Sequence, residues 1–243
     1  MIALITGTSN GIGNSIVKKL LAKNQEVIGI DKKINKTFKN KNFYSNKLNI
    51  LDAKSVFKFL KKLKNKKKIP DCFILNAGIN IYDNDKSFNL DYFKECFNIN
   101  FYGVMNFVNA IENLKIRNKK IICVSSTSNI IPNPKSLGYY SSKILLKKNF
   151  QLLNFNKTND YKTVILGPVK TKISRNLQKP SGLAGVIYRI LQISSDKAAI
   201  KIISFVNSSK KILYATYFSL IVYYFIKSII FFMPNIYMKN IRS

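Results

Sequence analysis

The first 31 residues constrain the fold more than any other part of the chain. A short apolar run at residues 1–6 leads into a turn that contains three glycines, and apolar residues at helical spacing follow up to Leu21. A second apolar run, at residues 27–30, ends at Asp31. A strand, a glycine-rich turn, an amphipathic helix and a second strand form a βαβ unit, whose two strands are parallel. The chain therefore begins as an α/β fold.

The same alternation of short apolar runs and helical patterns continues along the chain. It predicts strands near residues 42–48, 72–75, 120–124 and 163–166, and helices near 52–64, 90–114, 137–156 and 196–206, with a candidate last strand at 210–214. This order predicts a Rossmann-type, doubly wound parallel sheet in a three-layer αβα arrangement. We expect one domain over residues 1–215 and an apolar, helical C-terminal extension over residues 216–243.

The composition excludes several kinds of site. The chain has no histidine, which rules out Ser-His-Asp and Cys-His catalysis and His-ligated metals. Its three cysteines are far apart, so we expect no disulfide framework, no metal site and a reducing compartment. The first residues lack the charged region and cleavage site of a signal peptide, so the sequence predicts a cytoplasmic protein.

The net charge of +30 is a poor indicator of a nucleic-acid partner. Of the 41 Lys and Arg residues, only four are arginine, whereas Lys, Asn and Ile are all very frequent. A compositional bias of the genome explains such a chain, and a dedicated nucleic-acid binder uses arginine more often for base and phosphate contacts. We therefore expect no nucleic-acid partner.

The glycine-rich turn has the spacing Gly7-x3-Gly11-x-Gly13. Glycines let the backbone approach a pyrophosphate, whose charge then meets the free N–H groups of the helix N-terminus, although such turns also join strands to helices with no ligand. Asp31 strengthens the ligand interpretation, because a carboxylate there accepts hydrogen bonds from both ribose hydroxyls and repels a 2′-phosphate. This favours NAD over NADP, but Lys32 follows at once and leaves NADP open.

A second group of residues has the chemistry of proton transfer. Tyr139 and Lys143 are four residues apart and so share one face of a helix, whereas Tyr140 falls on another face. A nearby ammonium lowers the pKa of a phenol, which then exchanges a proton with a carbonyl or alcohol oxygen. Such a pair is commonplace in a lysine-rich chain. Ser126 adds weight, since it follows a strand whose carboxyl end is where open α/β sheets bind ligands.

Together these motifs resemble the short-chain dehydrogenase/reductase family over residues 1 to about 215. The motifs, in family order and spacing, are Thr6-Gly7-x3-Gly11-Ile12-Gly13, Asn76-Ala77-Gly78, Asn100-x2-Gly103, Ser126, Tyr139-x3-Lys143 and Gly167-Pro168-Val169-x-Thr171. The resemblance implies an NAD(P)-dependent oxidoreductase of CH-OH groups, which interconverts a small-molecule carbonyl and an alcohol by hydride transfer. We also expect a homo-oligomer, either a dimer or a tetramer.

The resemblance assigns four catalytic residues. Tyr139 would be the acid/base, and Lys143 would lower its pKa and bind the nicotinamide ribose. Ser126 would polarise the substrate carbonyl, while Asn100 would hold a water that links Lys143 to solvent. For Ser125, beside Ser126, we expect only a hydrogen bond at the strand end.

The resemblance also assigns the cofactor site. Its residues would be Gly7, Ser9, Asn10, Gly11, Ile12, Gly13, Asp31, Asn49, Asn76, Ala77, Gly78, Tyr139, Lys143, Pro168, Val169 and Thr171. Leu75 replaces the first Asn of the family's Asn-Asn-Ala-Gly motif, and Gly167-Pro168 reverses the commoner Pro-Gly. Asn49 stands where an Asp usually meets the adenine ring, and its amide oxygen can accept the same bond.

The segment from residue 212 to residue 233 contains 22 residues and one charge, Lys227. It resembles the apolar extension of family members that associate with membranes, and its length, its tyrosines and the flanking lysines fit a lipid surface. We expect peripheral attachment rather than a span, with the chain at the cytoplasmic face of a membrane and a hydrophobic substrate. The alternative is a buried helix that closes the substrate pocket or a dimer interface.

Two other functions fit the same fold. Nucleotide-sugar epimerases and dehydratases also use a Tyr/Lys pair, but those chains are usually longer. A non-catalytic nucleotide-binding protein is the second alternative, against which the complete set Asn100, Ser126, Tyr139 and Lys143 argues. The substrate cannot be read from residues 172–195, which contain no recognisable motif.

Overall fold

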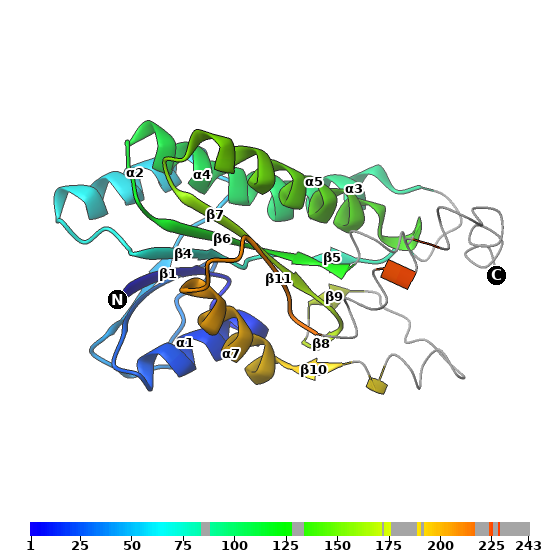
Figure 1. Cartoon of the computed structure of the whole chain (residues 1–243), viewed down its shortest axis with the longest axis horizontal. Helices are drawn as coiled ribbons and strands as arrows, with labels where there is room; N and C mark the ends of the chain where they lie inside the picture. Colours follow the sequence, from blue (N-terminus) through cyan, green and yellow to red (C-terminus); the bar gives the residue numbers. More distant parts are fainter. Residues whose placement is uncertain are drawn as a thin grey trace.

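A seven-stranded parallel sheet runs through the middle of the molecule and confirms the predicted Rossmann-type fold (Figure 1). The computed structural model describes residues 1–83, 88–127, 134–171, 173–175, 189–190, 192–216, 224–225 and 228. The strands of the sheet are β1 (Ile2–Thr6), β2 (Glu26–Asp31), β3 (Phe43–Lys47), β4 (Cys72–Leu75), β6 (Lys120–Ser126), β7 (Asp160–Leu166) and β11 (Ile212–Tyr214). Their order is β11-β7-β6-β4-β1-β2-β3, and every neighbouring pair is parallel. The candidate last strand is therefore also confirmed.

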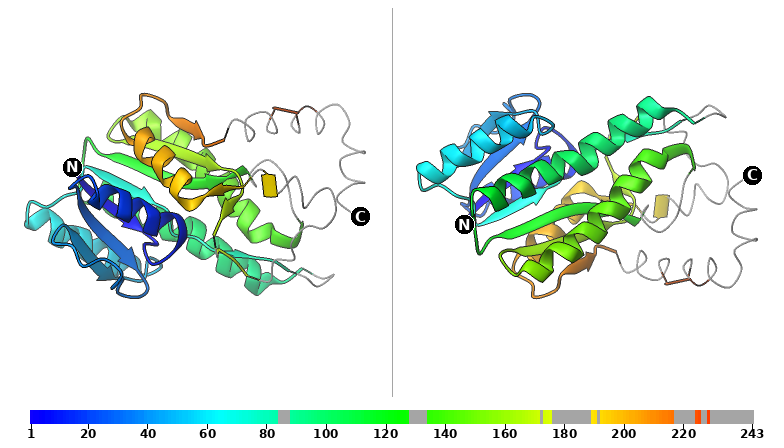
Figure 2. Two further views of the ribbon diagram at one scale, coloured as in Figure 1. Left: turned by 90° about the horizontal axis from the view of Figure 1, so that it is seen from below. Right: turned by 90° about the horizontal axis from the view of Figure 1, so that it is seen from above.

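Helices cover both faces of the sheet (Figure 1 and Figure 2). One face carries α1 (Gly11–Leu21) and α7 (Ser195–Val206), and the other carries α2 (Ala53–Asn65), α3 (Leu90–Phe97), α4 (Gly103–Asn113) and α5 (Leu137–Leu153). Successive strand residues enter opposite cores: Leu4 and Phe73 pack towards α2 and α4, whereas Ile5 and Ile74 pack towards α1 and α7. Burial on both faces explains why the inner strands β1, β4 and β6 contain continuous apolar runs, whereas the edge strand β3 has no buried residue.

The helix predicted over residues 90–114 is not a single α-helix. Its middle turn, Asn98–Tyr102, is π-helical and separates α3 from α4. A π turn inserts one extra residue and occurs frequently at functional sites. Here the turn contains Asn100, which is completely buried. The amphipathic pattern continues on both sides of the turn, so hydrophobic periodicity alone did not locate it.

Two small sheets hold the chain that follows β7. In one of them β8 (Val169–Lys170) pairs with β10 (Ile193–Ser194), and in the other β5 (Asn80–Ile81) pairs with β9 (Ser174–Arg175). Each strand has two residues, too few for a pattern in the sequence to predict. The pairs fix residues 169–170 and 174–175 beyond the carboxyl ends of β7 and β4.

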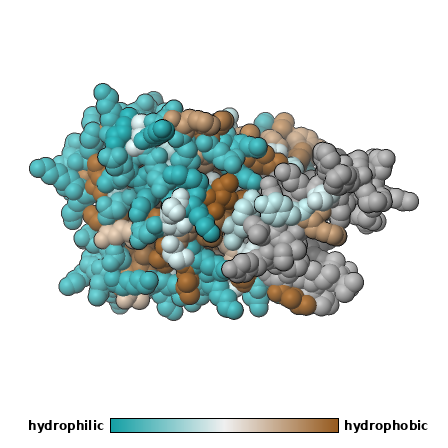
Figure 3. All heavy atoms as spheres, viewed as in Figure 1, coloured by the Kyte–Doolittle hydropathy of each residue, from teal (hydrophilic) through white to brown (hydrophobic). Residues whose placement is uncertain are grey.

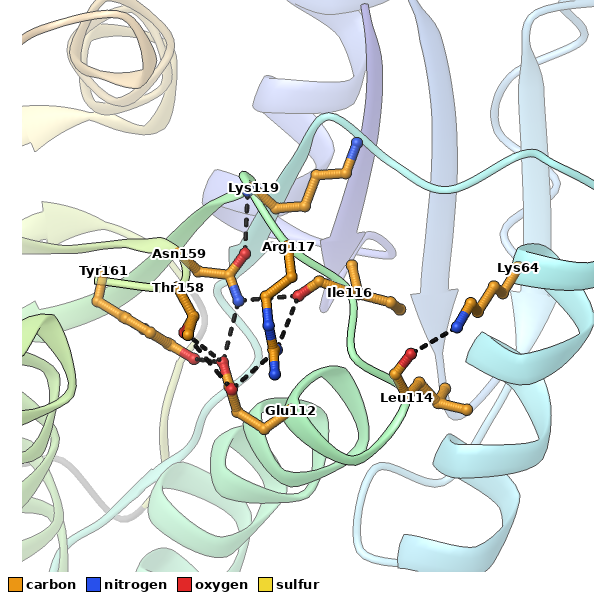
Figure 4. Close-up of polar contacts among 9 residues, drawn as sticks. All are labelled: Lys64, Glu112, Leu114, Ile116, Arg117, Lys119, Thr158, Asn159 and Tyr161. Atoms are coloured by element: carbon orange, nitrogen blue, oxygen red, sulfur yellow. Dashed lines mark hydrogen bonds and ion pairs between the residues drawn. The ribbon is translucent and has the colours of Figure 1, made fainter. Parts of the chain in front are cut away.

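One carboxylate joins the end of α4 to the start of β7 (Figure 4). Glu112 accepts hydrogen bonds from the Tyr161 hydroxyl (2.7 Å), the Asn159 amide (3.0 Å) and the Thr158 hydroxyl (3.2 Å), and pairs with Arg117 at 3.0 Å. Burial opposes ionisation of Glu112, but these hydrogen bonds and the Arg117 charge outweigh it, so the pKa of Glu112 is lowered. The network therefore holds an ionised Glu112 at the edge of the sheet opposite the carboxyl ends of the strands.

The surface carries the excess of lysine. In the view of Figure 3, hydrophilic residues cover most of the described surface, with apolar residues between them. Residues 61–68, the basic run at the end of α2, are mostly exposed. Of the predicted apolar segment, Ile212–Tyr214 belongs to the central sheet, Ala215 is buried, and nearly all of the remainder lies outside the described residues. No helix within the described ranges is long and apolar enough to cross a membrane.

Candidate active site

A cleft of about 370 Å³ opens at the carboxyl ends of β1, β2 and β4. The connections from β1 and β4 leave in opposite directions along the sheet, and open α/β sheets bind ligands at such a point. The lining contains nine of the residues predicted to bind the cofactor: Gly7, Asn10, Gly11, Ile12, Asp31, Asn76, Ala77, Gly78 and Thr171. The structure thus brings together predicted residues from four separate parts of the sequence.

The glycine-rich turn needs its glycines for two different reasons. Gly7 and Gly11 have φ angles of +74° and +55°, which side chains strongly disfavour. Gly13 is required by packing, because a Cβ there would lie 2.0 Å from the carbonyl oxygen of Gly7. The first turn of α1 therefore packs directly on the turn that precedes it.

The motif Asn76-Ala77-Gly78 supports this turn from the neighbouring strand. The Asn76 amide donates to the Thr6 carbonyl (3.1 Å), and the Ala77 amide donates to the Thr6 hydroxyl (2.9 Å). A Cβ on Gly7 would lie 2.9 Å from the Ala77 Cα, so the two loops are in close contact. The two motifs therefore form one wall of the cleft.

Asp31 is the last residue of β2 and lines the cleft, as predicted. One of its carboxylate oxygens accepts the Ser9 backbone N–H at 2.9 Å, and the other accepts the Lys32 backbone N–H at 2.7 Å. Each carboxylate oxygen keeps a further lone pair for a ligand. Lys32 lies beside Asp31 in the same lining, so a cation and an anion both face this end of the cleft.

The glycine-rich turn fits the diphosphate of a dinucleotide. The α1 N-terminus has no acidic residue in its first turn, and the side chain of its N-cap residue, Asn10, makes no capping hydrogen bond. The hydroxyl oxygens of Thr8 and Ser9 are buried, and neither has a hydrogen-bond partner among the described residues. Free N–H groups at a helix N-terminus attract an anion, and buried hydroxyls normally require a partner. The residues present therefore fit an NAD(P) group.

Tyr139 and Lys143 share one face of α5, and both are buried. The Lys143 ammonium lies 5.4 Å from the centre of the Tyr139 ring and donates a 2.8 Å hydrogen bond to the Val124 carbonyl. Burial lowers the pKa of Lys143 to about 8, because its charge is removed from water. A Cβ on Gly78 would lie 3.5 Å from the Lys143 nitrogen, so this pair adjoins the cleft.

The side chain of Asn100 is held by its neighbours. Its oxygen accepts the Ile79 N–H (2.8 Å), and its nitrogen donates to the Ile79 carbonyl (2.9 Å) and the Ser142 hydroxyl (3.2 Å). The Asn100 side-chain amide thus links the β4–β5 connection to α5. The predicted water relay is not tested by these contacts, so that role stays a prediction.

The two serines at the end of β6 have different surroundings. Ser125 is buried and donates to the Lys143 carbonyl (3.0 Å), which confirms the expected strand-end hydrogen bond. Ser126 is half-buried and ends the strand. Its role at a substrate carbonyl remains a prediction.

Seven predicted cofactor residues are not part of the cleft lining: Ser9, Gly13, Asn49, Tyr139, Lys143, Pro168 and Val169. Asn49 is exposed, and its side-chain oxygen accepts the Leu51 N–H (3.2 Å) in a local turn. Pro168 and Val169 lie at the start of β8, where the Pro168 carbonyl accepts the Ile193 N–H. Thr171, by contrast, reaches across the cleft: a Cβ on Gly11 would lie 3.2 Å from its methyl carbon.

The sequence reasoning missed the apolar part of the lining. These residues are Ile30, Leu48, Ile50, Ile79, Ile99 and Ile173. Most of them sit beside a predicted polar or glycine motif, where isoleucine, a frequent residue throughout this chain, carries no distinguishing signal. Leu48 directly follows the end of β3, a position that could have indicated it, whereas Ile30 lies within β2 and Ile99 in the π-helical turn.

The fold and the cleft define a dinucleotide-binding α/β protein of the Rossmann type. A family model described as short chain dehydrogenase matches residues 1–182. The chain belongs to this family of oxidoreductases. The nucleotide-sugar epimerase or dehydratase alternative is accordingly not favoured.

Curated relatives agree with this membership. An uncharacterized oxidoreductase of Schizosaccharomyces pombe is 30% identical over 148 residues, which cover 59% of this chain and 51% of that protein. The chain thus spans about half the length of this relative. The 3-oxoacyl-[acyl-carrier-protein] reductase FabG of Buchnera aphidicola subsp. Schizaphis graminum is 29% identical over 72% of this chain and 76% of its own length.

Solved structures show the same fold. A short chain dehydrogenase of Burkholderia cenocepacia in complex with NADP has a TM-score of 0.76 and 17% identity, covering 100% of this chain and 97% of its own. A short chain dehydrogenase of Leptospira borgpetersenii with bound NAD+ has a TM-score of 0.71 and 18% identity, covering 86% of this chain and 85% of its own. Structural neighbours therefore bind either dinucleotide.

Proposed function

We propose that this protein interconverts a carbonyl and an alcohol with an NAD(P) cofactor, with Tyr139 as the acid/base. The observation that carries the proposal is the buried Tyr139–Lys143 pair, which adjoins a cleft with a glycine-rich turn and Asp31 in its lining. The Lys143 ammonium lies 5.4 Å from the centre of the Tyr139 ring, and a phenol beside an ammonium is suited to proton transfer. The cleft next to this pair supplies the cofactor site.

In the proposed mechanism, Tyr139 donates its phenol proton to the carbonyl oxygen as the alcohol forms. The Lys143 ammonium stabilises the phenolate that remains, and Ser126 donates a hydrogen bond to the same carbonyl oxygen. Lys143 then returns a proton to Tyr139 and is itself reprotonated through a water held at Asn100. A bound nicotinamide supplies the hydride, or accepts it in the reverse direction.

For the cofactor we propose NAD rather than NADP, held by the glycine-rich turn, by Asp31 at the ribose, and by Asn76–Gly78 and Thr171. The Asp31 carboxylate lines the cleft and disfavours the negative charge of a 2′-phosphate. Lys32 in the same lining offers a phosphate partner and is the reason to test both cofactors.

A panel of carbonyl substrates, run in parallel with NADH and NADPH, tests this assignment. The panel includes hydrophobic ketones and 3-oxoacyl thioesters, because a FabG relative reduces a 3-oxoacyl group. We expect turnover with at least one hydrophobic carbonyl and a higher kcat/KM with NADH. A preference for NADPH of about 100-fold, or about 2.7 kcal/mol, would overturn the assignment of NAD. Failure of every carbonyl with both cofactors would overturn the reaction itself.

We further propose that residues 1–215 form the catalytic domain, and that the apolar extension at 216–243 attaches the protein to the cytoplasmic face of a membrane. The sheet already includes Ile212–Tyr214, so lipid contact begins beyond the buried Ala215. The full chain is expected to float with anionic vesicles in a density gradient, and removal of residues 217–243 is expected to leave it in the dense fraction. A full chain that stays with the dense fraction as a monodisperse dimer would instead support a buried helix.

A further inference from the structure

One peptide group of the glycine-rich turn is held at both of its polar ends. The N–H of Ser9 donates to the Asp31 carboxylate at 2.9 Å, and the carbonyl of Thr8 accepts the Asn35 side-chain amide at 2.8 Å. These two atoms belong to the same planar unit, so the two contacts together fix its orientation. Asp31 ends β2 and Asn35 lies four residues further on, and the two side chains form a two-point clamp on the turn.

We infer that Asn35 is a positioning residue for the dinucleotide site, which acts by holding the Thr8–Ser9 peptide group in place. The inference rests on the proposed function. It adds Asn35 to the residues of the dinucleotide site. Asn35 belongs to none of the sequence motifs, since it lies between the lysines that follow Asp31 and the next strand.

Asn35 is itself locked in one orientation. It is 6% exposed, its side-chain oxygen accepts the Thr37 N–H at 2.9 Å, and its own N–H donates to the Ser45 hydroxyl on β3 at 2.7 Å. If the Asn35 amide were flipped, its NH2 group would face the Thr37 N–H, and its oxygen would face the Thr8 carbonyl oxygen. The hydrogen bonds therefore fix which end of the amide faces the turn.

The clamp acts where the cofactor needs a rigid backbone. The hydroxyls of Thr8 and Ser9, which flank the clamped peptide group, are two of the three buried side-chain oxygens that have no partner within the described part of the chain. Without Asn35, the Thr8 carbonyl keeps only a long 3.3 Å contact from the Asn14 amide. The turn would then lose its fixed orientation, and dinucleotide binding would weaken. Tyr139 and Lys143 lie on α5, a different element from the β1–α1 turn and the end of β2 that the clamp joins, so the chemical step should be preserved.

Asn35→Asp tests the clamp most directly. This change keeps the size of the side chain and the acceptor for Thr37, but it sets a carboxylate oxygen against the Thr8 carbonyl. We expect the Kd of NADH and of ADP-ribose to rise by about 30-fold, with kcat at saturating cofactor changed by less than about threefold. Asn35→Ala removes the donor without repulsion, and its Kd should rise by about fivefold. Calorimetry measures both ligands, and thermal melts show which variants fold.

Asn46→Asp is the matched control. It adds the same charge on β3, where the Asn46 amide contacts the Tyr44 carbonyl (2.9 Å) and, at 3.5 Å, the Gly29 carbonyl, rather than the glycine-rich turn. Its Kd should change by less than about threefold. If Asn35→Asp and Asn35→Ala bind as the wild type does, or if Asn46→Asp weakens binding as much as Asn35→Asp, the inference is wrong. A wild-type protein that binds no dinucleotide would overturn the proposed function and the inference with it.

Discussion

Tyr139→Phe is expected to lower kcat by about 10²- to 10⁴-fold, the range that a positioned acid/base contributes. The ring stays in its buried cluster with Ile81 and Cys96, so the variant should fold normally. Phenylalanine cannot donate a proton to the carbonyl oxygen, whereas the cleft that holds the dinucleotide is unchanged. The Kd of the cofactor should therefore stay within about threefold of the wild-type value. Steady-state kinetics and cofactor titration measure the two quantities separately.

Tyr140→Phe is the control for this change. Tyr140 is the next residue on α5, is only half-buried and lies on a different face of the helix. Its variant should keep near-normal turnover. Substantial turnover by Tyr139→Phe, or an equal loss in both variants, would remove Tyr139 from the mechanism.

The order of elements along the chain was predictable because the inner strands of the central sheet are buried on both faces, whereas the edge strands β3 and β11 are only partly buried. β4 is entirely buried and appears as the uninterrupted apolar run Cys72–Leu75. The N-cap of α2 was equally clear, since the Asp52 side chain accepts the Ser55 N–H. A helix cap depends on residues close in sequence, and a buried strand depends on apolar side chains. Both therefore leave a recognisable pattern in the amino-acid sequence.

What the sequence did not reveal depends on contacts between distant residues. The π-helical turn at Asn98–Tyr102 and the pairing of β5 with β9 have no periodicity of their own. The clamp from Asn35 to Thr8 joins residues 27 positions apart, in a chain where asparagine is frequent. For the candidate site, motif spacing predicted the glycine-rich turn and Asp31, but not the apolar residues elsewhere in the lining, such as Leu48, Ile79 and Ile99.

Lys143→Met is expected to abolish activity and yet to stabilise the fold at neutral pH. Burial lowers the pKa of Lys143 to about 8 from a usual value of 10.5. Holding the charged form in the folded state therefore costs about 3 kcal/mol at pH 7. Methionine has a similar shape and no charge, but it leaves the Val124 carbonyl without its 2.8 Å hydrogen bond, a loss of about 1 kcal/mol. The net gain is about 2 kcal/mol, or a rise in Tm of about 4–8 °C.

The pH dependence of the stability gain distinguishes the removal of a buried charge from better packing of the methionine side chain. Between about pH 8 and pH 10.5 the unfolded chain binds a proton at Lys143 that the folded protein has released, so the wild-type free energy of unfolding rises with pH in this window. The advantage of Lys143→Met should therefore be largest below pH 8 and shrink towards pH 10.5. Lys148→Met, on the exposed side of α5, should show no such gain. Chemical denaturation at pH 7 and pH 10 measures the difference, and an advantage that does not change with pH would show that Lys143 does not carry a buried charge.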